Sequence, residues 1–185
     1  MGNFFSNLWE SLAGPRLYKI IVVGLNNAGK TTIVYSLQLN KFVETNPTIG
    51  GTPEELTYKN IKFIAWDLGG QEQLRESWSL YYPSTDAVVF VVDSSARERF
   101  GVAKKELHQI LAADELSQAC ILVFANKQDV KGAASPEEIA IALDLGSVAS
   151  RSWTLQPCSA LKSEGVQEGM AWIVEHIGKA AAGDH

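Results

Sequence analysis

One short stretch constrains the fold of this chain more than any other feature of its sequence. Residues 24–31 read GLNNAGKT, which is the Gly-x-x-x-x-Gly-Lys-Thr spacing of a phosphate-binding loop. The apolar run Leu17–Val23 precedes this loop and a helical pattern starts near Lys30, so the loop joins a strand to a helix. In that setting the backbone amides and the N-terminal end of the helix face phosphate groups. We expect Lys30 to reach the β- and γ-phosphates and the Thr31 hydroxyl to bind Mg²⁺.

Apolar runs and helical patterns alternate along the rest of the chain. Glu54–Tyr58 is less apolar than the other runs, which favours an edge strand paired with Ile61–Trp66. Capping-box spacings at Ser95–Glu98 and Ser135–Glu138 indicate two helix starts. The alternation predicts an α/β fold of three layers with a mostly parallel sheet, whose ligands lie beyond the carboxyl ends of the strands. The runs that read as buried strands are Leu17–Val23, Ile61–Trp66, Ala87–Val92, Cys120–Phe124 and Trp153–Pro157.

The length and charge of the chain exclude several classes of protein. A chain of 185 residues forms one domain, and its net charge of -5 without a basic stripe argues against nucleic-acid binding. Two cysteines are too few for a disulfide framework. The longest apolar run, Ala119–Ala125, is far too short to cross a bilayer. We therefore expect a soluble intracellular domain.

Two further loops have residues suited to a phosphate site. Asp67 directly follows the run Ile61–Trp66, which is where nucleotide hydrolases place a carboxylate near the metal. We expect Asp67 to reach the metal through water. The Gly70 amide would approach the γ-phosphate, and Gln71 would orient the attacking water. Thr48, in Pro47–Gly50, would bind Mg²⁺ through its hydroxyl and the γ-phosphate through its amide, a contact that hydrolysis breaks.

The loops after the last two apolar runs have the residue types that recognise guanine. The Asp129 carboxylate would accept hydrogen bonds from the N1–H and 2-amino groups of guanine, a donor pair that adenine lacks. Lys127 would lie against the base, and Asn126 would tie this loop to the phosphate loop. The loop after the final run contains Ser159 and Ala160, and the backbone amide of Ala160 would donate to guanine O6. The four loops follow strands in the order expected of one nucleotide site.

With these motifs in place, the chain resembles the small GTPases of the ADP-ribosylation factor (Arf) and Arf-like family over essentially its whole length. The motifs are Gly24–Thr32, Pro47–Gly50, Trp66–Glu72, Asn126–Asp129 and Cys158–Leu161. The resemblance implies a six-stranded GTP-binding domain over residues 16–180, helices on both faces of the sheet, GTP or GDP with Mg²⁺, and catalysis by Gln71 with Lys30. Thr31, Thr48 and Asp67 would hold the metal. The residues implied for GTP binding are Gly24, Asn26, Asn27, Ala28, Gly29, Lys30, Thr31, Thr32, Thr48, Gly70, Asn126, Lys127, Asp129, Ser159 and Ala160.

Two positions depart from the most familiar Arf proteins. Asn26 stands where they have Asp, which removes a charge beside the phosphates. Of the three aromatic positions on which family effectors dock, Trp66 and Tyr81 match, but the third is Gly51. The sequence therefore favours an Arf-like protein over a true Arf, with an effector surface that includes these three residues.

The first fifteen residues have the features of a membrane anchor. Residues 1–6 read MGNFFS, which fits N-myristoylation at Gly2. A single myristoyl chain gives a membrane affinity of only about 10⁴ M⁻¹, so a second signal is required. An apolar helix face would supply it; the alternative is an ordinary amphipathic helix packed on the domain. We expect this helix over residues 1–15 and a frayed tail over 181–185, and the resemblance implies that GTP binding expels the helix. The apolar residues on this face are Phe4, Phe5, Leu8, Trp9 and Leu12.

Three arginines are the chain's own candidates for an arginine finger. They are Arg75, Arg97 and Arg99, and none occupies a position where the family supplies a finger. We expect the finger to come from a GTPase-activating protein. Such a finger accelerates hydrolysis by about 10³–10⁵, so intrinsic hydrolysis is expected to be slow.

Together these features predict a monomeric GTP/GDP switch, and the resemblance implies a role in intracellular vesicle trafficking. The resemblance further implies that it is cytoplasmic and cycles onto endomembranes such as the Golgi. Its expected partners are a guanine-nucleotide exchange factor, a GTPase-activating protein, effectors and the membrane surface, and no nucleic acid. Two alternatives remain open. A GTP-dependent scaffold with negligible hydrolysis would have no use for Gln71, and a small-molecule kinase would need an arginine-rich lid and no guanine-reading Asp129.

Overall fold

The computed structural model describes residues 17–39, 51–58, 61–68, 70–148 and 151–177. The expected N-terminal helix with Gly2, the loop with Thr48 and the expected tail lie outside the described residues. Among the described residues, no helix has the length and apolar character needed to cross a bilayer.

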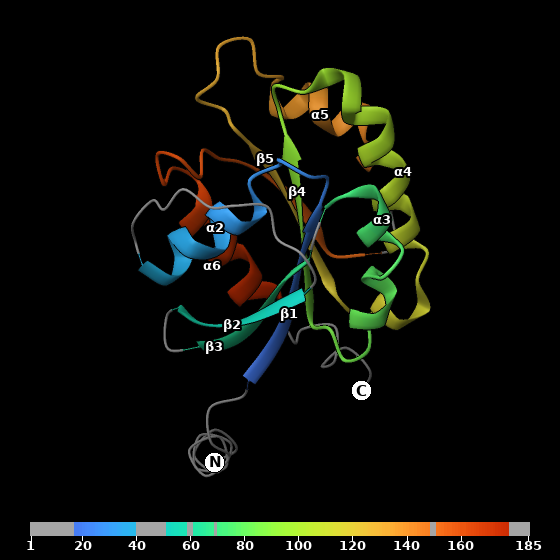
Figure 1. The fold of residues 1–185 in the computed structure, drawn as a ribbon, viewed down its shortest axis with the longest axis vertical. Helices are drawn as coiled ribbons and strands as arrows, with labels where there is room; N and C mark the ends of the chain where they lie inside the picture. Colours follow the sequence, from blue (N-terminus) through green and yellow to red (C-terminus); the bar gives the residue numbers. More distant parts are fainter. Residues whose placement is uncertain (1–16, 40–50, 59–60, 69, 149–150, 178–185) are drawn as a thin grey trace, which may run out of the picture.

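The centre of the fold is a six-stranded sheet in the order β2-β3-β1-β4-β5-β6 (Figure 1). Neighbouring strands are parallel except for β2, which lies antiparallel to β3 at the edge. This confirms the mostly parallel sheet and the edge hairpin expected from the sequence. The strands are β1 (Leu17–Gly24), β2 (Gly51–Tyr58), β3 (Ile61–Leu68), β4 (Ala87–Asp93), β5 (Cys120–Asn126) and β6 (Trp153–Pro157).

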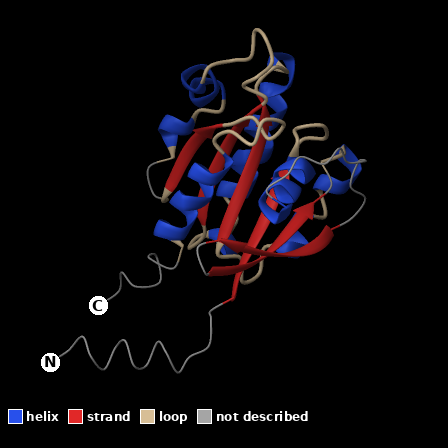
Figure 2. Cartoon of the chain, turned by 90° about the vertical axis from the view of Figure 1, so that its left-hand side faces the viewer, coloured by secondary structure: helices blue, strands red, loops and turns tan. Residues whose placement is uncertain are grey.

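Helices cover both faces of this sheet (Figures 1 and 2). One face packs against α2 and α6 through alternate strand residues such as Val22, Val89 and Leu122. The residues between them, such as Val23 and Phe90, point to the other face, where α4 and α5 lie. Because both faces are buried, the central strands read as continuous apolar runs. The helices are α2 (Lys30–Leu39), α3 (Glu72–Arg75), α4 (Phe100–Leu111), α5 (Pro136–Ala142) and α6 (Val166–His176).

One of the two predicted capping boxes forms. Ser135 accepts from the Glu138 amide while the Glu138 carboxylate accepts from the Ser135 amide, and α5 starts at Pro136. The prediction at Ser95 was wrong. Its amide and hydroxyl both donate to the Asp93 carboxylate at the end of β4, at 2.9 and 2.6 Å, and the N-cap of the following turn is Ala96, which makes no side-chain cap. A 3₁₀ turn at Arg97–Arg99 follows, and α4 begins only at Phe100.

Candidate nucleotide site

The loop between β1 and α2 wraps closely around the Lys30 side chain. Lys30 is 6% exposed, and its Nζ donates to the Leu25 carbonyl at 3.1 Å. Gly29 has φ +94°, and a Cβ at this position would lie 2.3 Å from Nδ2 of Asn126. Only glycine fits this turn. The loop is therefore closed on itself, with its ammonium group held inside.

The Lys30 ammonium has little compensation within the protein. Burial lowers its pKa to about 8, the Asp67 carboxylate acts to raise the pKa, and the Arg99 guanidinium lowers it further. A buried cation of this kind is stabilised by an anion placed beside it. The loop therefore has the geometry and the charge to hold a phosphate group.

Thr31 and Asp67 form the oxygen pair expected near the metal. The Thr31 hydroxyl donates to Oδ2 of Asp67, which is 3% exposed at the end of β3. In the described part of the chain, no group of three or more His, Cys, Asp or Glu residues is arranged to hold a metal ion. Mg²⁺ is often held by one or two protein oxygens together with water and substrate phosphates, so this donor set fits Mg²⁺.

Gly70 brings the end of β3 against the phosphate loop. Its carbonyl accepts from the Asn26 amide at 2.9 Å, and a Cβ on Gly70 would lie 2.4 Å from the Gly24 carbonyl oxygen. The next residue, Gln71, is exposed and precedes α3, and its side chain makes no capping hydrogen bond. Gln71 thus follows the residue that contacts the phosphate loop, and its side-chain amide does not cap the helix.

Asn126 joins three loops at the carboxyl edge of the sheet. Its Nδ2 donates to the Ala28 carbonyl at 2.9 Å, which is the link to the phosphate loop expected from the sequence. Its Oδ1 accepts from the Ala160 amide at 2.9 Å. The structure thus pairs the Ala160 amide, expected to face guanine O6, with Asn126.

Two polar contacts orient the residues expected to read the base. Oδ1 of Asp129 accepts from the Ser159 hydroxyl at 2.6 Å, and Nζ of Lys127 pairs with Oδ2 of Asp93 at 2.7 Å. Burial acts to raise the pKa of Asp93, but hydrogen bonds from Lys127 and Ser95 outweigh it and hold that pKa below its ordinary value. Sequence reasoning missed Asp93; its position at the end of a buried parallel strand was the signal that would have found it.

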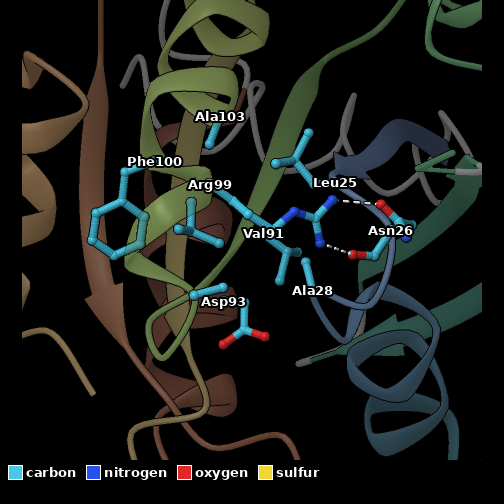
Figure 3. A pocket seen from close by; sticks show the side chains of 10 residues that line it. Leu25, Asn26, Ala28, Val91, Asp93, Arg99, Phe100 and Ala103 are labelled. Atoms are coloured by element: carbon cyan, nitrogen blue, oxygen red, sulfur yellow. Dashed lines mark hydrogen bonds between the residues drawn. The ribbon is translucent and has the colours of Figure 1, made fainter. Parts of the chain in front are cut away.

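The three candidate arginines have three different partners. Arg75 pairs with Glu106 at 2.6 Å, and Arg97 makes a two-pronged contact with Glu138 at 2.9 Å. Arg99 reaches the phosphate loop, where its Nη1 donates to the Asn26 carbonyl at 2.8 Å and its Nη2 donates to Oδ1 of Asn26 at 2.5 Å (Figure 3).

Two of the predicted effector residues lie against each other. The Trp66 and Tyr81 rings are 5.3 Å apart between centroids and tilted by 50°. Lys19 holds this corner, since its Nζ donates to the Tyr81 carbonyl at 2.6 Å and lies 6.0 Å from the centre of the Trp66 ring. Gly51 pairs with Leu68 at the start of β2.

Comparison with known proteins gives matches over nearly the full chain. The sequence model of the ADP-ribosylation factor family matches residues 5–177. ADP-ribosylation factor-like protein 5A of Bos taurus is 46% identical over 177 residues, covering 96% of this chain and 98% of that protein. ADP-ribosylation factor-like protein 1 of Saccharomyces cerevisiae is 48% identical over 178 residues, covering 96% and 97%. The structure of the Arl6 BBS3 small GTPase from Trypanosoma brucei, with bound nucleotide analogue GppNp, has a TM-score of 0.82 at 30% identity and covers 91% of this chain and 100% of that chain.

Proposed function

The chain belongs to the ADP-ribosylation factor family, and we propose that it is a membrane-recruited switch whose nucleotide lies on the loops at the carboxyl edge of the sheet. As a family member it is a small GTPase: it binds GTP and GDP, hydrolyses GTP, and works with exchange factors, activating proteins and effectors. The observation that carries the assignment of the site is the Asn126 side chain. It connects the loop expected to bind the base with the loop expected to bind the phosphates.

Hydrolysis would be carried out by few groups of this chain. Lys30 would balance the charge on the transferred phosphoryl group, and the exposed Gln71 amide would orient the attacking water. Thr31, Thr48 and Asp67 would hold Mg²⁺, with Asp67 acting through water; the ion would neutralise charge on the phosphates. None of the three candidate arginines is placed as a finger by its contacts, so we propose that an activating protein supplies one and that intrinsic hydrolysis is slow.

Guanine selection would depend on Asp129. Its carboxylate is held by the Ser159 hydroxyl, and it would accept from the N1–H and 2-amino groups of guanine. Lys127, fixed by its ion pair with Asp93, would lie against the base. Adenine lacks this pair of donors, so it would leave the Asp129 carboxylate unpaired and would be rejected.

Membrane recruitment would come from the N-terminus. Gly2 would be myristoylated and the apolar helix face over residues 1–15 would provide the second membrane signal. We propose that the protein cycles between the cytoplasm and endomembranes such as the Golgi in vesicle trafficking, with effectors docking near Gly51, Trp66 and Tyr81.

Two measurements test this proposal. The first is equilibrium binding of GTP and ATP to the purified protein, where tight binding of GTP alone is expected. The second is liposome flotation of the N-myristoylated protein loaded with GDP or with a non-hydrolysable GTP analogue. Flotation of only the GTP form supports the switch, whereas equal flotation of both forms would show a constant anchor and contradict nucleotide-controlled recruitment.

A further inference from the structure

Arg99 lies beside the phosphate site but has no role in the function proposed above. It ends the 3₁₀ turn before α4, and its guanidinium group extends to Asn26, which is 73 positions away in the sequence. Figure 3 shows the two parallel hydrogen bonds, one to the backbone carbonyl and one to the side-chain amide oxygen of Asn26.

The partners of Arg99 are uncharged, which separates it from the other two candidate arginines. Arg75 and Arg97 each pair with a glutamate, whereas no carboxylate forms an ion pair with Arg99 in the ranges that the structure describes. The carboxylate of Asp93, which also lines this pocket, accepts hydrogen bonds from Lys127 and from Ser95. Within these ranges, the positive charge of Arg99 next to the phosphate loop is therefore not balanced by an ion pair.

The guanidinium group of Arg99 has solvent on one side and an apolar pocket on the other. The pocket beneath the guanidinium is lined mainly by apolar side chains, among them Leu25, Val91, Phe100 and Ala103 (Figure 3). Charges interact more strongly across an apolar region than across water.

We propose that Arg99 is a specificity-determining residue that favours the triphosphate over the diphosphate form of the nucleotide. It is held in place by Asn26 and acts by its charge through the phosphate loop, without entering the reaction. A triphosphate has one more negative charge than a diphosphate, so an uncompensated cation beside the phosphate loop stabilises it more. This inference rests on the phosphate site proposed above.

The competing role for Arg99 is a purely mechanical brace of the loop. A brace would change the affinity for both nucleotides by the same factor, whereas a charge changes their ratio. The test is the ratio of GTP to GDP affinity, measured by competition against a fluorescent guanine nucleotide at fixed Mg²⁺. The variants are Arg99→Gln, which removes the charge, and Arg99→Lys, which keeps it.

The control is Arg97→Gln, which removes an exposed positive charge two positions away that is already paired with Glu138. We expect Arg99→Gln to lower the ratio by about threefold to tenfold, with Arg99→Lys and Arg97→Gln within about twofold of the wild-type protein. Raising the salt concentration from about 0.05 M to about 0.5 M should narrow the difference, because it screens a charge and leaves a brace intact. Asn26→Asp, which supplies Arg99 with a counter-charge and keeps both hydrogen bonds, should also lower the ratio.

Two results would overturn the inference in distinguishable ways. If Arg99→Gln and Arg99→Lys weaken GTP and GDP binding by equal factors, Arg99 is only a brace and the phosphate site stands. If Lys30→Ala, shown to be folded by circular dichroism, binds both nucleotides as tightly as the wild-type protein, the phosphate site itself is wrong and the inference falls with it.

Discussion

Arg75 of α3 and Glu106 of α4 form an ion pair of 2.6 Å in which the two side chains are only 12% and 14% exposed. Nε of Arg75 is also buried and finds no acceptor in the part of the chain that the structure describes. The pair fastens the short helix after Gln71 to a helix that packs on the sheet. A change at either residue therefore affects both stability and the segment that presents Gln71.

Replacing Glu106 should destabilise the fold clearly. Glu106→Gln leaves the Arg75 charge largely buried without a counter-ion, and we expect the free energy of unfolding to fall by about 3 kcal/mol. Lys104→Ala is the matched control on the same helix, because its pair with Asp144 is 44% and 49% exposed and should contribute less than about 1 kcal/mol. Urea denaturation measures both values, and equal losses would show that burial of the Arg75 pair has no energetic consequence.

Gln71 should be required for hydrolysis but not for nucleotide binding. Gln71→Leu removes the amide that orients the attacking water, so single-turnover GTP hydrolysis should slow by at least about tenfold while GTP affinity stays within about twofold. Gln73→Leu makes the same change at another exposed position two residues away. If Gln71→Leu hydrolyses GTP at the wild-type rate, Gln71 does not orient the attacking water. That result would favour the alternative of a GTP-dependent scaffold.

The sequence predicted the fold well because the strands are buried on both faces. Each central run was identified, but the strands continue one or two residues further, to Gly24, Leu68, Asp93 and Asn126. The residue directly after each of these predicted runs is polar or small, which hid the continuation. They are the residues that the nucleotide edge of the sheet requires, so the boundary errors fall at the candidate site.

The contacts of Asp93 and Arg99 could not be predicted from motifs. A spacing rule reads residues close in sequence, whereas Arg99 contacts Asn26 across 73 positions and Lys127 contacts Asp93 across 34. The predicted capping box at Ser95 failed for a different and local reason. The Ser95 amide and hydroxyl donate to Asp93 at the end of β4, and the turn that follows starts from Ala96 instead of Ser95.

Asp129→Asn should change the base preference of the protein. The amide of Asn can accept only one of the two guanine donors, and its NH₂ group would face the other, so GTP affinity should fall by at least about a hundredfold. Xanthosine triphosphate has a carbonyl where guanine has its amino group, so its affinity should rise. Asp114 is an exposed acid that follows α4 in the sequence, and Asp114→Asn should change neither affinity. Unchanged GTP binding by Asp129→Asn would place the base elsewhere.

Both cysteines should be unreactive in the folded protein. Burial raises the pKa of Cys120 to about 12 and raises the pKa of Cys158 as well, so neither has an appreciable thiolate fraction at neutral pH. We expect an aromatic disulfide reagent at about pH 8 to modify neither thiol within the time in which it modifies both in denaturant. Rapid labelling of one native thiol would indicate local opening at its strand end.

Glu138 should make stability depend on pH in the acidic range. Hydrogen bonds from Arg97 and from the Ser135 amide hold its pKa at about 2, below the ordinary value of 4.5. A carboxyl group with a lowered pKa stabilises the fold fully above its unfolded pKa, and this contribution is lost as the pH falls from about 4.5 towards 2. The melting temperature of Glu138→Gln should therefore lie below that of the wild-type protein at about pH 6, and the difference should shrink by about pH 3. Glu175→Gln, an exposed glutamate on α6, should show a smaller difference at about pH 6. A gap for Glu138→Gln that stays constant across this range would mean that the lost contribution comes from packing rather than from the charge.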